Sequence, residues 1–151
     1  MQLKYRFFSI LRHIALTLLI SSFIPAAYAQ TCRVSMGDSN GHQAYMEVYE
    51  YDYVSEKPSF PGGDCQLMEF INHTRKYPDK AYRRGIQGRV TCSFVVNANG
   101  SISHVTVLKS VEESLNREAV RILSLMPDWT PGRVDGRPVP VRVVRCIPFR
   151  R

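Results

Sequence analysis

The sequence predicts an α+β fold with two layers, in which helices pack on one face of an antiparallel sheet. Two observations predict this class. Apolar residues alternate along 88–96, 102–108 and 139–149, as in half-buried strands, and recur at helical spacing along 114–126. The elements also follow in the order strand, helix, short helix, strand, strand, helix, strand, which favours helices gathered on one side of an antiparallel sheet.

The first 29 residues are expected to be a signal peptide. Three basic residues precede an apolar run of 11 residues, Ile14–Ile24, and Ala27-Tyr28-Ala29 fits the small-residue cleavage rule, so that Gln30 begins the mature chain. The run is shorter than the roughly 20 apolar residues of a membrane span. We therefore expect an exported protein, which would be anchored in the membrane if the segment is not cleaved.

Composition limits the mature chain to one small domain. Cleavage would leave 122 residues and lower the formal net charge from +7 to +4, because the removed segment holds three basic residues and no acidic one. This length suits a single domain with a modest core. No basic run is interleaved with aromatic residues, so we expect no nucleic-acid partner.

Residues 30–57 are predicted to form an N-terminal extension. Residues 30–43 are polar and expected to be irregular. Along Ala44–Val54, Tyr49, Tyr51 and Tyr53 alternate with acidic residues, and this pattern predicts a strand. The domain proper is expected to span residues 58–151.

Residues 58–85 predict a turn and two helices. Pro58–Asp64 is rich in proline and glycine, and Asp64 is the expected N-cap of a helix. The apolar face of this helix holds Leu67, Met68, Phe70 and Ile71. A short second helix is expected to begin at Pro78 and to end just before Gly85.

Residues 88–149 predict a hairpin, a helix and a last strand. Gly88–Val96 and Ile102–Leu108 form the hairpin, joined by Asn and Gly residues that suit a tight turn. Ser114 is the expected N-cap of the helix, and Val139–Phe149 is the final strand.

The residues predict no catalytic site, metal site or cofactor, and hence no enzyme. His42, His73 and His104 are scattered, the cysteines form no CxxC pair, and no glycine-rich phosphate loop is present. Glu112-Glu113 precede a helix. Two carboxylates at this position are expected to interact favourably with the helix dipole, and this structural role is preferred to acid–base chemistry.

Six pieces of sequence, taken in order, resemble a known family. They are Pro61-Gly62-Gly63-Asp64, Lys76-Tyr77-Pro78, Gly85-Ile86-Gln87-Gly88-Arg89-Val90, the hairpin from Phe94 to Gly100, Met126-Pro127-Asp128-Trp129-Thr130-Pro131-Gly132, and Gly136-Arg137-Pro138-Val139. Together they resemble the C-terminal domain of TonB over about residues 58–150. The resemblance implies a two-layer TonB/TolA-like fold, with helices on a three-stranded antiparallel sheet whose last strand is an edge.

The resemblance also implies a function in energy-coupled transmembrane transport. In the family, the edge strand pairs in the periplasm with the TonB box, an extended peptide of a TonB-dependent outer-membrane receptor, and main-chain hydrogen bonds supply the affinity. An ExbB–ExbD complex is a further implied partner if the N-terminus is retained as an inner-membrane anchor. Carried over to this chain, the partner-binding residues are Arg75, Lys76, Tyr77 and Pro78 of an approach segment, and Val139, Val141, Arg142, Val143, Val144, Arg145 and Ile147 of the pairing strand.

The four cysteines predict disulfides, since an even count in an exported chain is typical of an oxidising compartment. From the residues alone, three pairings are open. In the strand order that the resemblance implies, Cys92 and Cys146 lie on neighbouring strands and would form one bridge. Cys32 and Cys65 would then form the other.

Two other functions remain as alternatives. The domain could be a structural or regulatory module of the periplasm that keeps the fold, binds another envelope protein and transduces no energy. A small secreted enzyme or inhibitor is the third hypothesis, supported only by export and by the cysteine count.

Overall fold

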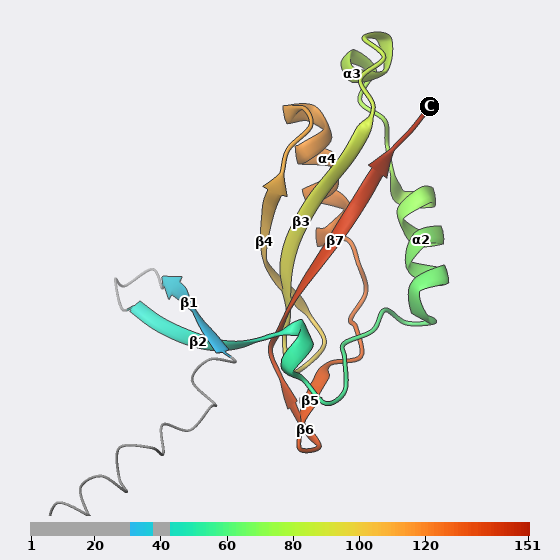
Figure 1. Ribbon diagram of the computed structural model, residues 1–151. Coiled ribbons are helices and arrows are strands. Elements are labelled where there is room, and N and C mark those ends of the chain that lie inside the picture. Colours follow the sequence, from blue (N-terminus) through green and yellow to red (C-terminus); the bar gives the residue numbers. More distant parts are fainter. Residues whose placement is uncertain (1–30, 38–42) are drawn as a thin grey trace, which may run out of the picture. The chain divides into compact units, whose positions relative to one another are not determined.

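The computed structural model describes residues 31–37 and 43–151, which belong to one compact unit (Figure 1). The predicted signal peptide and its cleavage site lie outside the described residues. The elements are β1 (Thr31–Gly37), β2 (Gln43–Glu50), the 3-10 helix η2 (Tyr51–Tyr53), α2 (Gly63–Thr74), α3 (Asp79–Arg83), β3 (Gly88–Val96), β4 (Ile102–Lys109), α4 (Glu113–Ser124), β5 (Gly132–Val134), β6 (Arg137–Val139) and β7 (Val141–Phe149). Within the described ranges, no helix is long and apolar enough to cross a membrane.

The main sheet has five strands in the order β1-β2-β7-β3-β4, and β5 and β6 form a separate two-stranded sheet. All neighbours in the main sheet are antiparallel except β2 and β7, which run parallel. The predicted α+β class is confirmed, but the three-stranded antiparallel sheet is wrong. The reason is that the N-terminal extension folds into the β1–β2 hairpin and joins the sheet beside β7.

The β1–β2 hairpin also corrects the prediction for the extension itself. Residues 31–37, expected to be irregular, form β1 and pair with β2 from Thr31↔Tyr49 to Gly37↔Gln43. Cys32, Val34 and Met36 alternate with polar residues in this segment. This period-two pattern is typical of a strand and was overlooked by the prediction, and pairing with β2 completes the strand. The predicted strand Ala44–Val54 ends at Glu50, where η2 begins. Tyr51 therefore does not continue the strand and instead packs against the core.

The core lies between one face of the sheet, here called the inner face, and the helices α2 and α4. Alternate residues of β3 and β7 are fully buried on that face: Val90, Cys92, Phe94, Val96, Val141, Val143, Ile147 and Phe149. Helix α4 adds Leu115, Ala119, Ile122 and Leu123, and α2 adds Leu67 and Ile71. Figure 1 shows α4 behind β3 and β4, with α2 running alongside β7.

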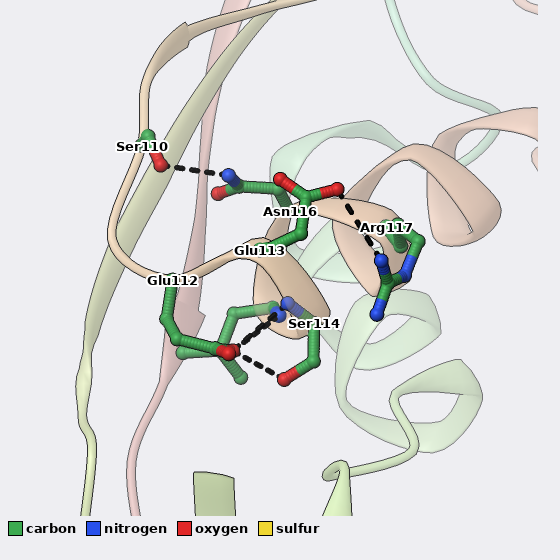
Figure 2. Close-up of polar contacts among 7 residues, drawn as sticks. Ser110, Glu112, Glu113, Ser114, Asn116 and Arg117 are labelled. Carbon is green, nitrogen blue, oxygen red and sulfur yellow. Dashed lines mark hydrogen bonds and ion pairs between the residues drawn. The ribbon is translucent and has the colours of Figure 1, made fainter.

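Helix α4 begins with a side-chain cap from Glu112 and not from the predicted Ser114 (Figure 2). The Glu112 carboxylate accepts hydrogen bonds from the N–H groups of Ser114 at 2.8 Å and Leu115 at 3.3 Å, and from the Ser114 hydroxyl. The hydroxyl bond, together with these N–H groups, lowers the pKa of Glu112. The prediction failed because the longer glutamate reaches the free N–H groups of the first turn from one position ahead of the helix.

The start of α2 is corrected in a similar way. Gly62 is the N-cap residue, with a φ of 81° and no side-chain cap, and Asp64 lies within the first turn. In this position the negative charge of Asp64 interacts favourably with the helix dipole. The short helix α3 follows Pro78 at its N-cap, and Gly85 lies past its end with a φ of 65°. The predicted glycine stop of this helix is therefore confirmed.

The predicted final strand is divided into two. Val139 belongs to β6 and pairs with Gly132 of β5, whereas β7 begins at Val141. Pro140 separates them because it has no N–H to continue a ladder. Its carbonyl instead accepts a hydrogen bond from the Tyr49 N–H at 2.9 Å. Val139 is thus not part of the strand that was expected to pair with a partner.

Candidate functional site

The two long sides of β7 have different partners. On one side, β3 pairs with all of β7, from Val96↔Val141 to Gly88↔Phe149. On the other side, β2 pairs only with Val141 and Arg142. No strand in the described part of the chain pairs with residues 143–149 on that side. We call this stretch, on the side away from β3, the open edge of β7.

The open edge exists because β2 stops early. Had β2 continued as a strand, Tyr51 would have come next beside Val143. Instead η2 begins at Tyr51 and the pairing ends. The Tyr51 ring lies 5.7 Å from the guanidinium carbon of Arg145, a cation–π distance. Among the described residues, part of this strand edge therefore has no backbone partner, which is the feature that strand addition requires.

The register identifies which backbone groups face the open edge. Residues of an antiparallel pair alternate between those that bond each other and those whose backbone groups face outward. Pro148 has no N–H, and its carbonyl accepts a hydrogen bond from Arg75 Nη1 at 2.5 Å, so its groups face away from β3. By alternation, the N–H and carbonyl groups of Val144 and Cys146 also face the open edge. The Val144 carbonyl accepts from Arg145 Nη1 at 3.1 Å. Within the described residues, this leaves the N–H groups of Val144 and Cys146 and the Cys146 carbonyl without a hydrogen-bond partner.

Most of the predicted partner-binding side chains of β7 are buried in the core or paired with other residues of the domain. Val141, Val143 and Ile147 are fully buried on the inner face, so only their backbone is near the edge. Arg142 forms an ion pair with Glu50 of β2 at 3.4 Å. Val144, with 46% of its surface exposed, is the one member of this predicted group that presents a free apolar side chain beside the open edge.

Arg145 interrupts the apolar alternation of β7, and the structure explains why. Its guanidinium carbon lies 5.7 Å from the Tyr51 ring centroid and 6.0 Å from that of Trp129, and Nη2 lies 3.8 Å from an Asp64 carboxylate oxygen. A long arginine can cover aromatic rings while its charged end stays near water. Arg145 thus joins β7 to η2 and to the first turn of α2.

The predicted approach segment, Arg75 to Pro78, lies next to the far end of β7. The Tyr77 ring packs edge-to-face on Phe149 at 5.9 Å, and its hydroxyl donates to the Ile86 carbonyl. The Lys76 N–H donates to the Glu118 carboxylate at 2.6 Å. Pro78 caps α3. Of these four residues, Arg75 is the one that contacts the open edge itself, through the Pro148 carbonyl.

Glu118 fixes this segment against α4. Glu118 is 8% exposed, and its carboxylate accepts two hydrogen bonds from Arg121, at 2.8 and 2.7 Å, besides the one from the Lys76 N–H. Burial disfavours its charge, but the bonds from Arg121 and Lys76 outweigh burial and lower the pKa of Glu118. Arg121 also donates to the Thr74 carbonyl at 2.6 Å. The end of α2, and Arg75 with it, is therefore held in place beside β7.

A groove lies between α2 and the end of β7. It has a volume of about 430 Å³ and is lined by Met68, Asn72, Arg75, Arg89, Cys146, Pro148 and Arg150. Three of these side chains are arginines and none is acidic. Cys146 and Pro148, whose backbone groups face the open edge, line this groove, and Arg89 stands opposite Pro148 in the register. The groove is therefore next to the open edge. The site thus combines unpaired backbone donors with a positively charged end.

The predicted Cys92–Cys146 bridge is not formed, and all four cysteines are free thiols. Cys92 stands opposite Arg145, whereas Cys146 stands opposite Thr91 and its Sγ lies 3.5 Å from Thr91 Oγ1. Positions offset by one residue point to opposite faces of a sheet. Burial, and then the nearby Cys146, raise the pKa of Cys92 to about 11. The predicted Cys32–Cys65 bridge is also absent.

Sequence reasoning missed four residues of the groove: Met68 and Asn72 of α2, Arg89 of β3, and Arg150. Arg89 alternates with the buried residues of β3, which signals only an outward-facing position. Its place beside Pro148 depends on the β3–β7 register, which no single segment contains. In the described part of the chain, no group of three or more His, Cys, Asp or Glu residues is placed to hold a metal ion.

The fold and this edge define a class of protein: a small α+β domain whose surface offers backbone hydrogen-bonding groups for recognition. Residues 73–150, just over half of the chain, match the family described as Gram-negative bacterial TonB protein C-terminal. The chain belongs to this family. The family resemblance predicted from the sequence is therefore confirmed.

Two relatives are similar over the same part of the chain. Both are called Protein TonB and come from Helicobacter pylori, strains J99 and 26695, and each is 39% identical over 92 residues. The match covers 60% of this chain but only 29% of each relative. A solution structure of the Helicobacter pylori TonB-CTD is 26% identical, covers 57% of this chain and 90% of that chain, and superposes with a TM-score of 0.44.

Proposed function

We propose that this domain binds an extended peptide of a TonB-dependent outer-membrane receptor by adding it as a strand to the open edge of β7, as part of energy-coupled transport. The observation that carries the proposal is the unequal pairing of β7, with nine residues paired to β3 and two to β2. Membership of the TonB C-terminal family supports it.

The chemistry of the edge suits a peptide better than a small substrate. Val144 and Cys146 offer N–H groups to an incoming backbone, and affinity from main-chain bonds requires an extended partner. The exposed Val144 side chain lies on the face opposite the core, where it can contact alternate side chains of that partner. In this proposal the domain acts in the periplasm, and an ExbB–ExbD complex would supply energy if the N-terminus is retained as an anchor.

A titration with receptor peptides tests the proposal. The purified domain is mixed with a synthetic TonB box peptide from a receptor of the same organism, and binding is followed by calorimetry. A scrambled peptide of equal composition is the control. We expect saturable binding of the native sequence alone. Absence of binding at millimolar peptide would contradict the proposal, since a weak strand-addition complex still forms at that concentration.

The binding site is tested with a proline variant. Val144→Pro removes one of the two donors on the open edge without removing a bond to β3. We expect the substitution to weaken peptide binding at least about tenfold, given that one main-chain bond and its neighbours are lost. Unchanged affinity would show that the peptide binds elsewhere on the domain.

A further inference from the structure

The positive charge of the domain is concentrated on the surface around α3. This surface, here called the basic tip, is formed by five basic residues: Lys76, Lys80, Arg83, Arg84 and Arg151. Residues 76–84 contain one acidic residue, Asp79. The rest of residues 30–151 holds twelve basic and twelve acidic residues. The basic tip, with Asp79, therefore accounts for the whole formal net charge of +4 on residues 30–151.

The charges of the basic tip have no acidic partner in the described part of the chain. All five residues are exposed, and none forms an ion pair with a described acidic residue. Six other basic residues do have such partners: Lys57, Arg117, Arg121, Arg133, Arg142 and Arg145. A cluster of uncompensated like charges attracts an anionic partner from a distance.

One aromatic ring is presented among these charges. Tyr82 of α3 is 52% exposed. Its ring packs edge-to-face on Tyr77, with centroids 5.6 Å apart, and the guanidinium carbon of Arg151 lies 4.7 Å from the Tyr82 centroid. Tyr77 in turn packs on Phe149 at the end of β7. The Tyr82 ring is thus held in place from below, and its apolar body and polar hydroxyl suit the interface between lipid and water.

The basic tip lies at one end of the molecule and projects from the sheet. Figure 1 shows α3 beyond one end of β3 and β7, whereas the β1–β2 and β5–β6 hairpins lie toward the other end. Strand β7 has nine residues, which span about 26 Å. The groove between α2 and β7 has none of the five tip residues in its lining. A charged surface that projects in this way suits a flat partner better than an enclosed ligand.

We propose that the basic tip binds the surface of a lipid bilayer that contains anionic phospholipids. Clusters of four or more Lys and Arg residues are attracted to the phosphate groups of such a surface. Tyr82 would lie at the level of the headgroups, where tyrosine side chains are enriched. The inference goes beyond the proposed function, because it concerns a different surface and a different partner. The contact would place the end of β7 near the bilayer.

The test measures binding to lipid vesicles by residues 31–151, a compact unit with its own core. One set of vesicles is an equal mixture of phosphatidylcholine and phosphatidylglycerol, and the control set is phosphatidylcholine alone. Co-sedimentation is measured at physiological ionic strength, where the Debye length is about 8 Å. We expect binding to the anionic vesicles and none to the neutral ones. Absence of binding to either set, or equal binding to both, would overturn the inference.

A triple variant of α3 connects binding to the basic tip. In Lys80→Gln/Arg83→Gln/Arg84→Gln, three charges are removed from exposed positions whose side chains form no ion pair among the described residues. The variant should therefore fold normally. We expect its binding to anionic vesicles to weaken roughly a hundredfold, which corresponds to about fivefold for each residue.

A second triple variant is the matched charge control. Arg33→Gln/Lys57→Gln/Arg137→Gln removes the same charge from exposed positions outside the basic tip. We expect binding to weaken less than about threefold, because β7 separates the two ends of the domain by about three Debye lengths. Equal weakening in both triple variants would show that net charge alone drives binding, and would overturn the inference.

A fluorescence reporter follows the contact itself. Tyr82→Trp places an indole on the basic tip, whereas the single tryptophan of the chain, Trp129, is 3% exposed in the core. We expect a blue shift of the emission with anionic vesicles and no shift with glycerophosphoglycerol, the soluble headgroup, at the same concentration. An equal shift with the headgroup would indicate a site for free phosphate. No shift with vesicles would favour a soluble acidic protein as partner, and either result overturns the inference.

The membrane inference and the proposed function fail separately. The α3 variant leaves β7 and its open edge unchanged, so peptide titration in the absence of lipid should give the wild-type affinity. Saturable peptide binding without vesicle binding would overturn the membrane inference and leave strand addition intact. Vesicle binding without peptide binding would overturn strand addition alone.

Discussion

The two sides of β7 belong to one strand but serve different purposes. The side toward β3 is paired along its whole length and carries the core residues Val143 and Ile147. The side away from β3 is paired at two residues and then left open. The comparison teaches that one strand can hold the domain together and still present free donors, since alternation separates the two sets of backbone groups.

The largest expected effect on stability is the difference between two proline substitutions, one at a residue whose N–H faces β3 and one at a residue whose N–H faces the open edge. In Val143→Pro, the lost N–H faces β3, so a ladder bond breaks and the buried Phe94 carbonyl is left without its partner. We expect a loss of about 3 kcal/mol or more in the free energy of unfolding. In Val144→Pro, the lost N–H faces the open edge, and we expect less than about 1 kcal/mol. Urea denaturation of both variants measures the difference, and equal losses would contradict the alternation.

A smaller contrast is expected between alanine substitutions on the same strand. Ile147→Ala removes a fully buried side chain and should cost about 3 kcal/mol through lost burial and a residual cavity. Val144→Ala changes an exposed side chain and should stay within about 0.5 kcal/mol. Chemical denaturation compares the two variants directly. Equal destabilisation would mean that the outer face at Val144 is covered.

Glu118 of α4 holds the segment that follows α2 beside β7, so its substitution tests how much this contact stabilises the domain. Glu118→Gln removes a charge that Arg121 and the Lys76 N–H both satisfy, and we expect about 2 kcal/mol of destabilisation at pH 7. Glu113→Gln is the control, because Glu113 is largely exposed in its pair with Arg117 and should cost less than about 0.5 kcal/mol.

The pH dependence has a definite sign. The folded pKa of Glu118 is lowered, so its stabilisation is complete above the unfolded value of about 4.3 and is lost as pH falls through the lower folded value. The difference in stability between wild type and Glu118→Gln should therefore shrink below about pH 4. A difference that grows in acid would contradict the proposed ion pair.

The smallest expected effect on stability is that of a reductant. Because the four thiols are free, adding a reductant should leave the melting temperature unchanged. Alkylation at pH 8 should modify the exposed Cys65 and Cys146 quickly, while the buried Cys92, with its pKa raised to about 11, reacts slowly. Peptide mapping that finds Cys92 joined to Cys146 would contradict the strand register.

Local patterns predicted the fold well where each segment is periodic. The β3–β4 hairpin and α4 repeat their apolar residues at clear intervals, and these elements are where the sequence placed them. The caps were less predictable, because Glu112 and Ser114 can both reach the free N–H groups of one helix. For β1, Cys32, Val34 and Met36 alternate with polar residues, but this short pattern was overlooked beside the polar, glycine-containing stretch that follows it. Pairing with β2 completes the strand.

The candidate site was predictable in part. The C-terminal strand and Arg75 were identified, but the site depends on where β2 ends and on how β7 aligns with β3. Arg89 reaches the groove through that register alone. The register also decided against the Cys92–Cys146 bridge, which a one-residue shift would have allowed. Pairings between distant segments are set by the packed sheet and cannot be read from one of its strands.

Amide hydrogen exchange on β7, with and without the receptor peptide, tests the central claim most directly. In the free domain, the N–H groups of Val144 and Cys146 should exchange faster than those of Val143, Arg145 and Ile147, which bond to β3. On adding peptide, we predict that Val144 and Cys146 gain protection while the other three change little. Protection gained instead along β1 or β4, with Val144 and Cys146 unchanged, would contradict strand addition at the open edge of β7.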